Sequence, residues 1–183
     1  TGLTSGQSVG TSDLTENGSV GQTMTAATNG TLAVALNTIA SYAITTPGMT
    51  VTLAELKYSA TLEDVNVKQI SLGMSGAASN SPDNLVNREV TLWDGATQVG
   101  LASFSSGDHA TGTLSGFTVP KDGSKVLAVK GKIAGISVSE AMNRSGEFPK
   151  VDYDGGSGLT SNYGSGASSG QTISPTGGGT SST

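Results

Sequence analysis

The single histidine of this 183-residue chain, His109, is the first candidate for chemistry. It closes a turn in which Ser105, Ser106 and Asp108 are close by in the sequence. A serine nucleophile, a histidine base and an orienting carboxylate must meet in space, and neighbours within one tight turn rarely do so. The sequence therefore favours a solvent-facing turn histidine over a catalytic triad.

Two pairs of acidic residues are the next candidates, Glu63 with Asp64 and Asp152 with Asp154. Carboxylate pairs that hydrolyse glycosides flank a cleft and lie about 5 to 9 Å apart. Both pairs here fall in polar stretches beside turn or glycine residues, which is typical of solvated loop acids. The chain also lacks cysteine, which removes a thiolate nucleophile. We therefore expect this protein not to be an enzyme.

Asp152 and Asp154 also belong to an acid-rich segment followed by glycines, Asp152 to Ser157. Alternate acids before glycine can surround a hard cation with oxygen ligands, so calcium is a candidate ligand here. An EF-hand loop would need a further ligand and a terminal glutamate, and the residues after Asp154 supply neither. An ordinary turn is the alternative, and no other cofactor is expected.

Trp93, the only tryptophan, is the candidate anchor for a glycan. Sugar-binding surfaces are usually lined by several exposed aromatic side chains, and Tyr58, Tyr153 and Tyr163 are the other members available. Trp93 alternates out of phase with its apolar neighbours, which places it on an outer face or under a covering segment. Packing is the favoured interpretation, and sugar stacking is the alternative.

The elements that must position these residues are predicted to be β-strands. Leu32, Val34 and Leu36 alternate with smaller residues, which indicates a half-buried strand. Asp94-Gly95 stands between two apolar runs and predicts a tight hairpin. Further strands are expected at 49–60, 65–74, 111–119, 125–133 and 151–153, with one helical turn at 137–143.

In the strands expected at 49–60 and 65–74, the apolar side chains change phase part-way along. Side chains alternate with a period of two, so the phase can change only where a strand gains an extra residue. The pattern predicts β-bulges near residues 54–55 and 68–69.

Short strands separated by turn signals, with little helix, indicate an all-β fold. We expect a two-sheet antiparallel sandwich of the immunoglobulin-like kind over residues 29–153. A polar arm or linker at 1–28 precedes it, and a tail or linker at 154–183 follows. Both flanking segments are rich in Gly, Ser and Thr and are expected to be extended.

Charge and hydropathy narrow the class of protein. The net charge of -5 would repel a phosphate backbone, which argues against nucleic-acid binding. No apolar run approaches the ~20 residues that span a bilayer. The chain begins at Thr1 without an initiator methionine, so we expect a processed or excised piece of a longer exported product.

Three sequence segments, each a predicted strand with its turn, resemble segments of known proteins. They are LAELKYSA at 53–60 leading into EDVNVK at 63–68, VTLWDG at 90–95, and FTVPK at 117–121 leading into SKVLAVK at 124–130. In that order they resemble the β-sandwich modules of large surface-layer-like or stalk-like surface proteins of uncultivated small-genome bacteria. The resemblance implies an extracellular, repeated, non-enzymatic module at the cell surface.

The sequence thus predicts a structural building module of an extracellular assembly, such as a surface layer, stalk or fibre. Its expected partners are copies of itself or adjoining domains of the same surface protein. One mechanism is strand donation, in which Leu32, Val34 and Leu36 complete a neighbour's sheet and fix the register. The alternative is an adhesive or carbohydrate-binding module with Trp93 as its anchor and a glycan as its partner.

Overall fold

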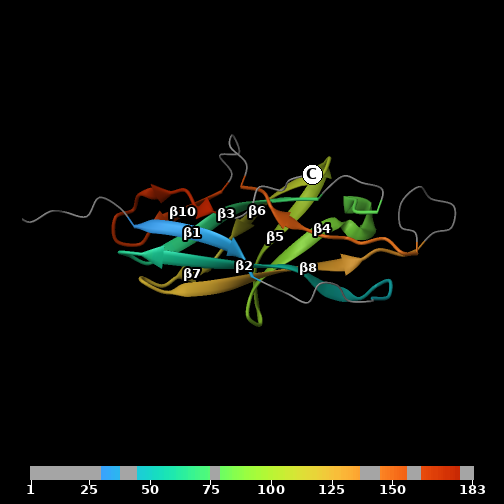
Figure 1. The fold of residues 1–183 in the computed structure, drawn as a ribbon, viewed down its shortest axis with the longest axis horizontal. Helices are drawn as coiled ribbons and strands as arrows, with labels where there is room; N and C mark the ends of the chain where they lie inside the picture. Colours follow the sequence, from blue (N-terminus) through green and yellow to red (C-terminus); the bar gives the residue numbers. More distant parts are fainter. Residues whose placement is uncertain (1–29, 38–44, 75–78, 137–144, 156–161, 178–183) are drawn as a thin grey trace, which may run out of the picture.

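The computed structural model describes residues 30–37, 45–74, 79–136, 145–155 and 162–177 (Figure 1). The arm at 1–28 and the helical turn at 137–143 lie outside these residues. Among the described residues there is one short 3-10 helix, η2 (Pro82–Asn84), and the other regular elements are strands. They are β1 (Thr31–Leu36), β2 (Thr50–Thr61), β3 (Val65–Gly73), β4 (Leu85–Asp94), β5 (Thr97–Ser106), β6 (His109–Leu114), β7 (Thr118–Val119), β8 (Ser124–Ile133), β9 (Asp152–Tyr153), β10 (Tyr163–Gly166), β11 (Thr172–Ile173) and β12 (Thr176–Gly177).

The all-β class is confirmed, but the expected two-sheet antiparallel sandwich is wrong. All twelve strands belong to one mixed sheet, which is curled into a half-barrel. Its main path runs β11-β10-β3-β6-β5-β4-β8-β2-β1-β12, and β7 and β9 pair with β3. In a sandwich the strands would divide into two sheets with no hydrogen bonds between them. Here β4 pairs with β8 and β5 pairs with β6, so the strands form one continuous sheet. Apolar alternation shows that one face of each strand is buried, but it does not say whether strands share a sheet.

Both predicted bulges are confirmed by the register of the strands. Pairing of β2 with β8 shifts between Thr52 and Ala54, so that Leu53 is the extra residue. Pairing of β10 with β3 skips Lys68. Each bulge returns the following apolar side chains to the buried face and increases the local twist, which helps a single sheet to curl.

The predicted hairpin is β4 and β5, with its turn one residue later than the Asp-Gly pair. Asp94 pairs with Thr97, so Gly95 and Ala96 form the two-residue loop. Gly95 takes a φ of 58°, a value suited to the first central position of a type II′ turn. The hairpin therefore has the twist that its flanking strands need.

The core fills the concave side of the sheet. Every long strand contributes alternate side chains to it, and the largest fully buried ones are Tyr58, Tyr153, Phe104, Phe117, Leu32, Leu56, Ile70, Leu72, Leu92 and Leu127. Tyr58 and Phe117 meet edge-to-face, with ring centroids 5.8 Å apart. One contiguous apolar cluster thus holds the curled sheet together.

The two strands at the ends of the sheet path, β11 and β12, are neighbours in the sequence. Only Ser174 and Pro175 separate them, so the Cα atoms of Ile173 and Thr176 can lie at most about 11 Å apart. The segment that the sequence placed in a polar tail therefore supplies three strands and borders both edges of the sheet. Each of these edge strands has only two residues, and Pro175 lies between them, so they offer little backbone for pairing with other chains.

Candidate functional site

Strand β1 is where the sequence predicted an assembly strand, and it pairs within its own sheet. It runs antiparallel to β2 over all six of its residues, and parallel to β12 at Ala33 and Val34 only. Leu32 and Val34 point into the core, whereas the side chain of Leu36 is 50% exposed. Of the three residues expected to fix register, two are therefore core residues of this chain.

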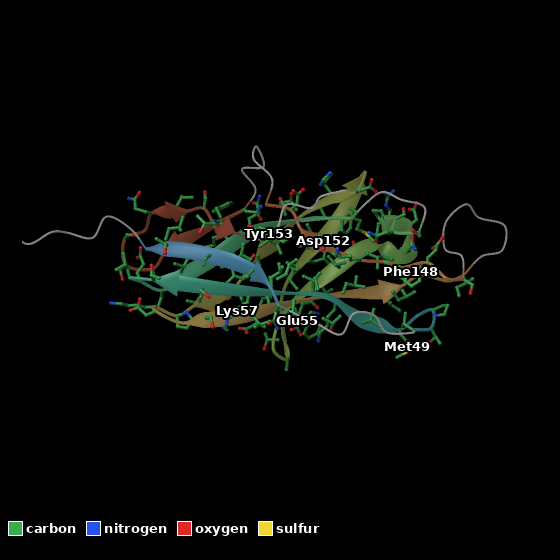
Figure 2. The ribbon with its side chains drawn as sticks, in the orientation of Figure 1. Met49, Glu55, Lys57, Phe148, Asp152 and Tyr153 are labelled. Carbon is green, nitrogen blue, oxygen red and sulfur yellow. The ribbon has the colours of Figure 1, made fainter. Side chains whose placement is uncertain are left out.

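Both ends of β1 are tied to the rest of the sheet by a glutamate. At the far end, the Asn37 backbone N–H donates to the Glu55 carbonyl at 2.8 Å, and Asn37 Nδ2 donates to Glu55 Oε2 at 2.7 Å. At the start, the Gly30 N–H donates to Glu63 Oε1 at 3.0 Å. Glu55 lies on β2, where Figure 2 labels it near Lys57.

Glu63 also holds the turn between β10 and β11. Glu63 Oε2 accepts the backbone N–H groups of Ser168 and Ser169, each at 2.9 Å, and Glu63 Oε1 accepts the Ser169 hydroxyl at 2.7 Å. One carboxylate therefore joins the start of β1 to the segment that leads to β12. We call Glu63, Gly30, Ser168 and Ser169 the chain-end anchor.

The chain-end anchor keeps Glu63 ionised although its side chain is buried. The Ser169 hydroxyl and backbone N–H, followed by the Gly30 N–H, stabilise the charged form and lower the pKa of Glu63 from 4.5 to about 2. Burial acts in the opposite direction and is outweighed. The carboxylate is thus a buried anion whose charge is compensated by these hydrogen bonds.

Two glycines leave the space that this carboxylate fills. A Cβ on Gly30 would lie 2.7 Å from Glu63 Cγ, and a Cβ on Gly166 would clash with Glu63 Oε1. Leu62 precedes the glutamate with a φ of 69°, a left-handed conformation that is uncommon for a leucine. This turn directs Glu63 inward, and Leu62 itself is exposed.

The same end of the molecule uses two more carboxylates to hold backbone amides. Asp64 Oδ1 accepts the Lys121 N–H at 2.6 Å, and Asp122 Oδ1 accepts the Leu62 N–H at 3.2 Å. These bonds tie the β2–β3 turn to the β7–β8 turn. Glu63 and Asp64, considered above as a possible acid pair, therefore both accept hydrogen bonds from backbone amides.

His109 finds its carboxylate partner far along the chain rather than in its own turn. His109 Nδ1 lies 2.7 Å from Asp154 Oδ2, and the Asp154 side chain is only 9% exposed while that of His109 is 68% exposed. Asn162 donates to the Asp154 carbonyl at 2.6 Å and accepts the Ser71 N–H at 2.7 Å. This network fastens the segment after β9 to β3. The side chains of Ser105 and Ser106 lie outside what the structure describes.

The two candidate calcium ligands each have a cationic or basic partner from the chain. Asp152 Oδ2 lies 2.9 Å from Lys150 Nζ, and Asp154 lies against His109. Figure 2 shows Asp152 next to Tyr153 on β9; Tyr153 is buried, and burial raises its pKa to about 12. Within the described ranges, no three His, Asp or Glu side chains gather as a metal site would require. Calcium binding by Asp152 and Asp154 stays a prediction.

Trp93 lies half-buried near the end of β4. Its indole N–H donates to Thr91 Oγ1 at 2.8 Å, and Lys130 Nζ lies 4.4 Å from the ring centroid. The ammonium group therefore covers one face of the ring in a cation–π contact. Trp93 is available to a planar sugar only over the part of its surface that these two residues leave free.

Comparison with family models, with curated proteins and with solved structures finds no match for this chain. No helix among the described residues is long and apolar enough to cross a membrane.

Sequence reasoning missed the chain-end anchor altogether. The donors to Glu63 are 33, 105 and 106 residues away, so nothing near the glutamate marks its role. The partnership of His109 with Asp154 was missed for the same reason.

Proposed function

We propose that this chain is a structural building module of an extracellular assembly, such as a surface layer, stalk or fibre, that packs with neighbouring copies. The observation that carries the proposal is the arrangement of β1. It is one strand from the end of the sheet, and β12 covers only two of its six residues. A strand with a partly uncovered edge can pair with another chain.

Exchange of β1 between copies is the mechanism we propose for packing. An exchanged β1 would keep the contacts it makes now, because Leu32 and Val34 would enter an identical core in the neighbour. Such exchange of an identical element needs no new interface chemistry. The described carboxylates support a structural role as well, since Glu63, Asp64 and Asp122 all hold backbone amides.

A reversible disulfide lock tests this mechanism. Ala33 lies opposite Ser59 on the outer face of β1 and β2, at a separation that suits a disulfide. The chain has no cysteine of its own, so A33C/S59C forms a defined lock. We expect electron microscopy to show fibres or sheets of the reduced double variant and light scattering to show monomers of the oxidised one.

The matched control places the same lock between β2 and β8. Lys57 lies opposite Val126, both are exposed, and K57C/V126C leaves β1 free to exchange. This control should assemble when oxidised. Deletion of residues 1–36 should abolish polymers and leave a poorly stable monomer. Assembly of the oxidised A33C/S59C variant, or of the deletion variant, would contradict the exchange of β1.

The alternative, an adhesive or carbohydrate-binding module anchored on Trp93, has less support. Lys130 covers one face of the indole ring, and Thr91 accepts its N–H. Glycan-array binding that is lost in W93A would favour this alternative over assembly.

A further inference from the structure

The first and last strands of the described chain, β1 and β12, are parallel neighbours. The polypeptide therefore joins β1 at one end of this pair and leaves β12 toward the other end. A pull on the two chain ends acts along the strands in opposite directions and loads the pair in shear. In shear the hydrogen bonds between two strands must break together, whereas in peeling they break one at a time. Figure 1 shows β1 running along the longest axis of the molecule.

The same pull loads the pairing of β1 with β2. The six residues of β1 lie opposite Leu56 to Thr61, and each pair resists sliding of β1 along its neighbour. The side chains of Leu32 and Val34 are 1% and 3% exposed. Since both must leave the core before β1 can slide, displacement of the strand also exposes apolar surface.

Glu63 connects the two ends of the described chain through hydrogen bonds. Gly30 is the residue before β1, and its N–H is bound to Glu63 Oε1. Ser168 and Ser169 precede β11 and β12, and both are bound to the same carboxylate. A pull on residues 1–29 therefore loads the chain-end anchor at the same time as the strand pairs.

We infer that this module is a tension-bearing link, in which the β1–β12 pair and the chain-end anchor form a clamp against force applied through residues 1–29 and 178–183. The inference rests on the proposed function for the source of the force, which neighbouring copies would supply. The clamp itself belongs to a single chain and is measured on single chains.

Constant-force spectroscopy with handles on the two chain ends tests the clamp. E63Q replaces one of the two acceptor oxygens by an amide NH2 group, which then faces either the donors of Gly30 and the Ser169 hydroxyl or the backbone N–H groups of Ser168 and Ser169. G177A adds a Cβ that would lie 2.8 Å from the Val34 carbonyl oxygen, at a residue with a φ of 80°. We expect each variant to shorten the lifetime of the folded chain under force by about tenfold or more.

Two control variants make similar substitutions at residues that do not connect the two ends of the described chain. D64N removes a carboxylate from the same turn, but its partner is the Lys121 N–H rather than a chain end. G170A has a similar φ of 68°, yet no atom lies within 4 Å of the added Cβ. Both controls should shorten the lifetime under end-to-end force much less than E63Q and G177A do.

A second pulling axis separates a clamp from a general loss of stability. Handles on A96C and H109C, both exposed and beside opposite ends of β5, direct the force along β5 between its neighbours β4 and β6 and bypass β1, β12 and the chain-end anchor. On this axis E63Q and G177A should resemble the parent chain. Equal shortening on both axes, or no shortening on the end-to-end axis, would overturn the clamp. A chain that never assembles would overturn the proposed function while leaving these single-chain lifetimes as predicted.

Discussion

Asn162 bridges two buried backbone groups that lie on different segments: its side chain accepts the Ser71 N–H at 2.7 Å and donates to the Asp154 carbonyl at 2.6 Å. Asn162 is itself buried. One amide side chain thereby fastens the C-terminal part of the sheet to β3. The same bond to the Asp154 backbone helps to position the carboxylate that contacts His109.

The first prediction concerns this bridge. N162A should destabilise the fold by about 1–3 kcal/mol, because it leaves a buried N–H and a buried C=O without their partner. H109A removes only an exposed imidazole and should cost less than about 1 kcal/mol. Urea unfolding of both variants measures the difference. A larger loss in H109A than in N162A would contradict this account of the network.

The second prediction is a pH dependence that originates from Glu63. Its pKa is about 2 in the folded chain and 4.5 ordinarily. A carboxyl with a lowered folded-state pKa contributes stability above its ordinary pKa, and that contribution is lost as pH falls toward the folded value. The stability difference between the parent chain and E63Q should therefore be constant at neutral pH and shrink between pH 4.5 and about pH 2.

Urea midpoints measured across that pH range provide the comparison. D64N serves as a reference for the general effect of removing one negative charge from the same turn. A difference between parent and E63Q that stays constant down to pH 2 would show that the carboxylate is not held in its ionised form.

The third prediction concerns Tyr58, whose ring fills the core while its hydroxyl has no hydrogen-bond partner among the described atoms. Burial, and secondarily the charge of Tyr153, raise the pKa of Tyr58 well above 10.0, so the hydroxyl stays neutral. Y58F removes an unsatisfied polar atom and should change the free energy of unfolding by less than about 1 kcal/mol. L56A, two residues away on the same strand and face, should cost about 2–5 kcal/mol. Comparable losses in the two variants would mean that the hydroxyl has a partner.

The fourth prediction uses Trp93, the only tryptophan, as its own reporter. Removal of the Lys130 ammonium in K130A should expose the indole, shift its fluorescence emission to longer wavelength, and cost about 0.5–1 kcal/mol. K132A, on an exposed residue two positions further along β8, is the matched control and should leave the emission unchanged. An unshifted emission in K130A would show that the ring is not covered by Lys130 in solution.

Strand positions and both bulges could be predicted because apolar side chains mark the buried face. The bulges at Leu53 and Lys68 followed from a phase change that only an inserted residue allows. In contrast, β10 turns Gly164 and Gly166 inward, so it carries no apolar alternation. A Cβ on Gly164 would lie 2.8 Å from a Val65 methyl carbon, which explains why the buried position holds glycine.

The candidate site was less predictable than the strands. Glu63 and His109 are recognisable as ionisable residues, but their partners are set by the curl of the sheet. Glu63 and Ser169, for example, are 106 residues apart in the sequence. They meet because the sheet curls, and the curl depends on the packing of the whole core. Local sequence patterns therefore do not predict such a pair.

The adjacency of β11 and β12 in the sequence has a consequence for how the protein is made. Of the described strands, β11 and β12 leave the ribosome last, and they border both margins of the sheet, so the sheet cannot be completed while they are still in the exit tunnel. Pairing of β1 with β12 also joins residues about 140 positions apart, such as Ala33 and Thr176, a kind of contact associated with slow folding. The edge of β1 that pairs with β12 should therefore stay uncovered until residues 172–177 have left the ribosome.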